Sequence, residues 1–106
     1  MGREQRVTLQ PGTRAAELYG TREAVERYYC SYGVNPEYAR RLVDGGLTVS
    51  GVGEAGEIRI VELRGHPFFM ATLYLPQASS SAAAPHPLVA GFAAAVRAAA
   101  ARVHAA

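Results

Sequence analysis

Alternating apolar and polar residues predict β-strands in several segments of the chain. The clearest are residues 7–9, 47–50 and 58–63. Three glycines between the last two segments predict a hairpin whose loop is longer than two residues. Residues 68–75 form a nearly continuous apolar run, which is typical of a strand covered on both faces.

Helices are predicted by capping residues and by helical spacing. The Asn-Pro-Glu sequence at 35–37 favours a helix start, and this helix is expected to run to about Asp44, before two glycines. Thr21 is a good N-cap for a helix over residues 22–27, which would follow a short extended piece at 15–19. A C-terminal amphipathic helix is predicted by apolar residues at helical spacing: Leu88, Phe92, Val96, Ala99 and Val103. We expect the apolar side of this helix to pack against the core.

Length and composition indicate one small domain over residues 1–106, or a fragment of a larger one. Hydrophobic residues make up 49% of the chain, enough for a core, although 20 alanines inflate that fraction. The net charge of +2 and the lack of a basic run argue against a nucleic-acid surface. No uncharged apolar stretch of about 18 residues is present, so we expect no membrane span. The single cysteine, Cys30, excludes an internal disulfide and fits a reducing cytoplasm.

Few residues offer catalytic chemistry on their own. The three histidines, His66, His86 and His104, are not spaced like zinc ligands, so we expect no metal and no other cofactor. Cys30 is the one candidate nucleophile, and it lies among Tyr28, Tyr29 and Tyr32. Apolar packing there would raise the pKa of the thiol, which favours a structural cysteine. The tyrosine cluster leaves open a reactive or ligand-contacting thiol that lines a pocket.

Short motifs follow one another over nearly the whole chain, at residues 7–13 (VTLQPGT), 18–20 (LYG), 32–38 (YGVNPEY), 46–51 (GLTVSG), 60–63 (IVEL), 66–72 (HPFFMAT) and 87–92 (PLVAGF). Together and in this order, they resemble the C-terminal end of the glutamine amidotransferase domain of CTP synthase. It implies an α/β fold, a partial class I glutamine amidotransferase (flavodoxin-like) open sheet with flanking helices and a C-terminal helix. The first strands and the turn with the nucleophilic cysteine would be missing. The chain is also similar to a divergent branch of proteins related to the CTP synthase C-terminal region, some of them labelled selenoproteins.

The chain departs from the family at the residues that carry the reaction. A class I glutaminase uses a cysteine, a histidine that deprotonates it and a glutamate that orients the histidine. By the resemblance, Leu75 stands at the histidine position and Gln77 at the glutamate position. A stretch that is rich in arginine and histidine in the family reads Tyr-Tyr-Cys-Ser at 28–31. The resemblance therefore implies that the base, its orienting residue and a substrate-binding arginine are absent.

These departures favour a non-catalytic amidotransferase-like protein (a pseudoenzyme) that binds a ligand or a partner. Two alternatives stay open at this point. One is an enzyme whose site is rebuilt around Cys30 as a redox or nucleophilic thiol. The other is a subunit that completes a CTP-synthase-like amidotransferase, in pyrimidine metabolism, with a separate chain. We expect a homo-oligomer or a separate chain that supplies the missing half, because an open sheet edge recruits strands from other chains.

Overall fold

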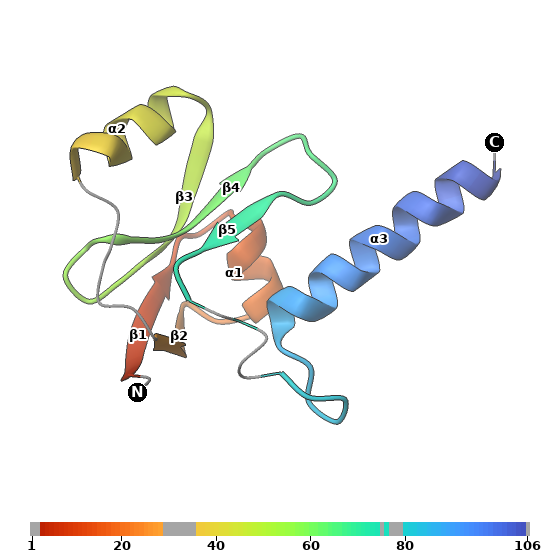
Figure 1. Cartoon of the computed structure of the whole chain (residues 1–106), viewed down its shortest axis with the longest axis horizontal. Helices are drawn as coiled ribbons and strands as arrows, with labels where there is room; N and C mark the ends of the chain where they lie inside the picture. The colour runs from red at the N-terminus through yellow and green to blue at the C-terminus, as the bar shows by residue number, and fades with distance from the viewer. Residues whose placement is uncertain (1–2, 29–35, 75, 77–79, 106) are drawn as a thin grey trace.

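The computed structural model describes residues 3–28, 36–74, 76 and 80–105 as an open five-stranded sheet with three helices (Figure 1). The elements in chain order are β1 (Arg3–Leu9), α1 (Arg14–Tyr19), β2 (Glu23–Tyr28), α2 (Pro36–Asp44), β3 (Leu47–Val52), β4 (Ile58–Leu63), β5 (Met70–Thr72) and α3 (Pro87–Ala105). The strand order is β2-β1-β3-β4-β5, and each of these neighbouring pairs is antiparallel. The predicted α/β class and the open sheet are thus confirmed.

β1 and β2 form a two-stranded ribbon at one side of the sheet. Their register runs from Arg3 opposite Tyr28 to Thr8 opposite Glu23. The helix predicted at residues 22–27 is therefore wrong. Its residues form a strand because they pair along the length of β1, a partner that no capping signal near Thr21 can reveal. Tyr28 ends β2, and residues 29–35 lie outside the described residues.

α1 begins at Arg14, so the extended piece predicted at 15–19 is also wrong. The Thr13 hydroxyl caps the helix by accepting a hydrogen bond from the Ala16 amide at 3.2 Å. The Glu62 carboxylate, from the distant strand β4, accepts from the amides of Arg14 at 2.8 Å and Ala15 at 3.1 Å. This helix of six residues is too short to be stable alone, and a carboxylate at its N-terminus satisfies amides that would otherwise lack acceptors.

The predicted helix at Pro36–Asp44 and the β3–β4 hairpin are both confirmed. Gly46 adopts a left-handed φ of 103° after α2, as a helix stop requires. The register of the hairpin shifts at Gly51, where a Cβ atom would lie 2.7 Å from the Cδ1 atom of Ile60. Gly51 therefore lets β3 pass close to the most buried part of β4.

The prediction that residues 68–75 form a strand covered on both faces is wrong. The strand that is buried on both faces is β4. Residues 58–62 are all buried, and the two charged ones are partnered. Arg59 pairs with Glu57 at 3.3 Å, and Glu62 caps α1. The apolar run instead yields the short strand β5, which pairs with β4 alone among the described strands.

The core lies between one face of the sheet and helices α1 and α3. It consists of Val7, Leu9, Ala15, Ile60, Tyr74 and Leu88. Only the first turns of α3 lie beside α1, and the rest of the helix extends away from the sheet (Figure 1). Leu88 is buried, but Phe92 is 55% exposed and Val96 is 50% exposed. The helix is confirmed, whereas the expected packing of its apolar side on the core is wrong beyond the first turn. Within the described residues, no helix is long and apolar enough to span a membrane.

Candidate functional site

A buried cluster of polar side chains lies where four separate parts of the chain meet. Glu26 comes from β2, Tyr19 from the end of α1, Tyr74 from the segment after β5 and His86 from the residue before α3. Glu26 is only 3% exposed and His86 only 5%. A carboxylate with so little solvent access needs hydrogen-bond donors from the protein.

The Glu26 carboxylate receives two of those donors at one oxygen. Its Oε2 atom accepts a hydrogen bond from the Tyr19 hydroxyl and lies 2.7 Å from Nε2 of His86. The Tyr74 hydroxyl lies 2.7 Å from the Tyr19 hydroxyl. Because the proton of Tyr19 is directed to the carboxylate, Tyr74 is the donor in that contact. The chain of hydrogen bonds therefore runs from Tyr74 through Tyr19 to Glu26.

The contacts of His86 assign its tautomer. Its Nδ1 atom accepts a hydrogen bond from the Leu88 amide at 3.1 Å, so this nitrogen carries no proton. The ring proton is then on Nε2, which donates to Glu26. The His86 backbone amide donates to the Ser80 hydroxyl at 2.9 Å. His86 thus joins β2 to the N-terminus of α3 and satisfies an amide in its first turn.

The electrostatics of the cluster keep Tyr19 protonated. Burial raises the pKa of Tyr19 far above that of a free tyrosine, and the neighbouring Tyr74 hydroxyl and Glu26 carboxylate raise this pKa further. Tyr19 therefore acts as a permanent hydrogen-bond donor. The second oxygen of Glu26, Oε1, is buried without a hydrogen-bond partner among the described residues.

This arrangement holds the fold together and is unsuited to proton transfer. A histidine that serves as a general base needs one ring nitrogen free to face the nucleophile, with the other held by the orienting carboxylate. In His86 one nitrogen faces Glu26 and the other faces the Leu88 amide. Neither nitrogen is left for a substrate or a nucleophile.

The residues singled out from the sequence lie beside this cluster along the chain. Leu75, Gln77, Cys30, Tyr29 and Tyr32 are outside the described residues, and of Tyr28 only the place at the end of β2 is described. Their roles stay predictions. The flanking residues are described: Glu26 is two positions before Tyr28, and Tyr74 directly precedes Leu75. The Tyr19 hydroxyl contacts both Glu26 and Tyr74. The candidate residues around Cys30 and those at 75 and 77 therefore follow, along the chain, two members of the same buried cluster.

The sequence interpretation missed the members of this cluster. Glu26 fell in a segment predicted as a helix, and His86 was considered only as a metal ligand. A weak signal was present only for His86, which lies between Pro85 and Pro87 with no charged residue adjacent to it. Among the described residues, no group of three His, Cys, Asp or Glu side chains could hold a metal ion.

Comparison with known proteins places this arrangement in a family context. The chain is 43% identical over 88 residues to CTP synthase of Sulfurisphaera tokodaii and 40% identical over 93 residues to CTP synthase of Mesoplasma florum. These matches cover 83% and 87% of this chain but only 17% and 18% of the relatives. The structure matches the glutaminase domain of Trypanosoma brucei CTPS, solved with bound acivicin, with a TM-score of 0.78 and 26% identity. That match covers 89% of this chain and 39% of the other. No protein-family model matches the chain.

The fold and these matches define the class: the chain is similar to part of a class I glutamine amidotransferase domain. The particular protein that it resembles is CTP synthase, in its glutaminase domain. The chain spans less than a fifth of the length of the curated relatives that it matches.

Proposed function

We propose that this chain is a non-catalytic, glutaminase-like protein that acts by binding a partner chain or a ligand. The observation that carries the proposal is the pair Leu75 and Gln77, which stand at the positions of the catalytic histidine and glutamate by the family resemblance. An aliphatic side chain has no nitrogen to accept a proton, and a neutral amide cannot stabilise a charged imidazole.

The contacts of His86 support the same proposal. His86 is the one histidine that the described structure pairs with a buried carboxylate, so it is the obvious substitute base. Both of its ring nitrogens are occupied, as described above. A relocated triad built on His86 would need the Leu88 amide to give up its acceptor. The single cysteine fits a reducing, cytoplasmic setting for this role.

The test is a glutaminase assay on the purified chain, with CTP synthase of Sulfurisphaera tokodaii as the active control. We expect no release of glutamate above the blank without protein. The double variant Leu75→His, Gln77→Glu should stay inactive, because it adds a base and an orienting residue but no positioned nucleophile.

Two outcomes would contradict the proposal. Glutamate release by the wild-type chain would reject it outright. Release that disappears in Cys30→Ser would in addition support the alternative in which the site is rebuilt around the Cys30 thiol.

A further inference from the structure

We infer that the apolar surface around β5 is a docking surface for the remaining part of a glutaminase-type domain. This surface, called the β5 seam below, consists of Phe68, Phe69, Met70, Leu73, Val89 and Phe92. The inference rests on the proposed partner-binding role and names the partner: a polypeptide that adds a strand to β5 and covers both faces of that strand.

The seam exposes large apolar side chains close together. Phe69, Leu73 and Val89 are each more than a third exposed, and Phe92 is more than half exposed. Phe68 lies edge-to-face against Phe92, with ring centroids 5.5 Å apart, so the seam continues from the β5 segment onto α3. Contiguous apolar surface of this kind marks an interaction site more often than scattered single residues do.

Hollows on both faces of β5 would receive side chains of the partner. One hollow, of about 240 Å³, is lined by Phe68, Met70, Leu88 and Phe92 among others. The other, of about 290 Å³, is lined by Leu42, Leu47, Val61, Ala71 and Leu73 among others. Met70 and Ala71 line different hollows because successive side chains of a strand point to opposite faces. A partner strand beside β5 would have apolar surface available on either side.

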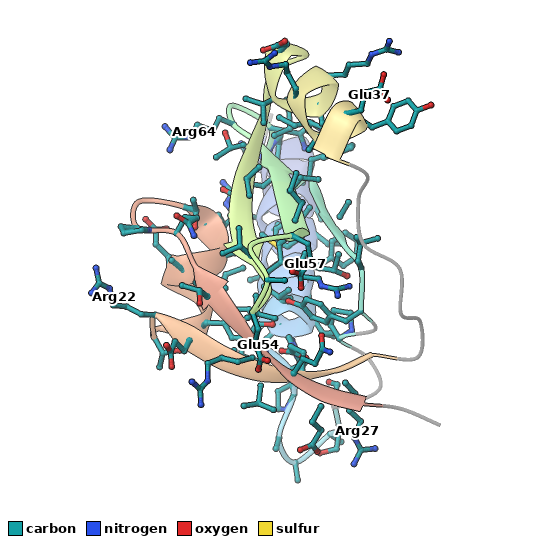
Figure 2. The ribbon with its side chains drawn as sticks, turned by 90° about the vertical axis from the view of Figure 1, so that its left-hand side faces the viewer. Arg22, Arg27, Glu37, Glu54, Glu57 and Arg64 are labelled. Carbon is teal, nitrogen blue, oxygen red and sulfur yellow. The ribbon has the colours of Figure 1, made fainter. Side chains whose placement is uncertain are left out.

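The opposite edge of the sheet is protected, in contrast. The β1–β2 ribbon carries cross-strand ion pairs between Arg6 and Glu23 and between Arg27 and Glu4. In Figure 2, the labelled side chain of Arg27 lies on β2, and that of Arg22 lies immediately before this strand. Charged edge strands discourage pairing with another chain, whereas β5 contains no charged residue. One edge of the sheet is therefore charged and the other is uncharged, as expected if only β5 pairs with a strand of another chain.

The choice of the occupant follows from how much of the matched domain this chain accounts for. This chain accounts for 39% of the matched glutaminase domain structure at a TM-score of 0.78. More than half of that domain therefore lies outside the match, which is enough polypeptide to supply a strand and its covering helices. A second copy of this chain is the competing occupant, and the experiment distinguishes the two.

The experiment measures capture of this chain by a defined probe. The probe is tagged CTP synthase of Sulfurisphaera tokodaii that lacks the 88 residues matched by this chain. As a positive control, those 88 residues are supplied as a separate chain, and their capture shows that the probe can bind its missing part. Leu73→Asp and Phe92→Asp place charges in the two hollows. Val25→Asp, on β2, is the control, because Val25 is an apolar residue that is more exposed than either of them. Circular dichroism checks that each variant is folded.

We expect a one-to-one complex with the wild-type chain and with Val25→Asp, and about tenfold weaker capture of each seam variant, which corresponds to about 1.4 kcal/mol. Hydrogen exchange of peptides that contain β5 should slow on binding. Failure to capture the wild-type chain with the competent probe would overturn the inference, as would equal weakening by Val25→Asp. A homodimer of the chain alone that Leu73→Asp breaks would assign the seam to a second copy instead. None of these readouts requires glutamine hydrolysis, so an active glutaminase would reject the proposed function while leaving the docking result intact.

Discussion

At the scale of single residues, the buried side chain of Glu26 connects several separate parts of the fold. Its buried carboxylate holds Tyr19 and His86, and through them it ties α1, the segment after β5 and the start of α3 to β2. A buried acceptor with two donors stabilises the fold mainly because its removal leaves both donors without partners.

Replacing this carboxylate should therefore be costly. We expect Glu26→Leu to lower the free energy of unfolding by about 3 kcal/mol, because the Tyr19 hydroxyl and the His86 ring lose their acceptor. Glu23→Leu, an exposed position on the same strand, should change stability by less than about 0.5 kcal/mol. Urea denaturation of both variants checks the difference. Equal effects would show that the cluster does not contribute to stability.

Tyr19 gives the chain a specific dependence on alkaline pH. Its pKa is raised in the folded state, so the folded chain holds this proton while the unfolded chain releases it above about pH 10. The stability that Tyr19 contributes is complete below pH 10 and is lost as the pH rises further, by up to about 1.4 kcal/mol per pH unit.

The matching experiment compares unfolding of the wild-type chain and of Tyr19→Phe between pH 9 and pH 11. We expect the variant to be less stable at pH 9 but to lose stability less steeply above pH 10. Tyr38→Phe, on the exposed side of α2, should keep the wild-type slope. Identical slopes for all three proteins would argue against the buried position of the Tyr19 hydroxyl.

At the scale of elements, long-range contacts account for two of the segments where the sequence prediction was wrong. Residues 22–27 form β2 because β1 lies beside them, and residues 14–19 form α1 because Glu62 and Thr13 satisfy its first amides. The predicted strands at 7–9, 47–50 and 58–63 and the helix at 36–44 were correct. In those segments local capping, glycine stops and alternation agree with the tertiary contacts, so the sequence suffices.

The two threonines that can act as caps give a direct test. We expect Thr13→Ala to cost about 1 kcal/mol of stability, since its hydroxyl accepts from the Ala16 amide at the start of α1. Thr21→Ala should cost less than about 0.5 kcal/mol, because Thr21 precedes a strand and is exposed. Thermal unfolding measured side by side would show the order. A larger loss at Thr21 would favour the helix that the sequence alone predicts.

At the scale of the whole molecule, the described sheet has one charged edge and one apolar edge. The β5 seam and the projecting part of α3 leave apolar side chains exposed to water.

This exposure predicts the behaviour of the isolated chain. We expect it to bind a hydrophobic dye such as anilinonaphthalene sulfonate in its folded state, and Leu73→Asp to reduce that fluorescence. Val25→Asp, which adds the same charge at the opposite edge, should reduce it less. If the two variants behave alike, the exposed apolar surface is not concentrated at β5.

The sequence by itself determined the α/β class, the hairpin, two of the three helices and the resemblance to the CTP synthase glutaminase domain, because each rests on local pattern or on residue identity. It also located Leu75 and Gln77, whose roles stay a prediction. Only the tertiary structure decided which apolar run is buried: β4 is covered on both faces, whereas β5 is only partly buried and the outer side of α3 is exposed. It alone brought together Tyr19, Glu26, Tyr74 and His86, which span 68 positions of the chain. Burial and long-range hydrogen bonds depend on what packs against a segment, and that information is not local to the segment.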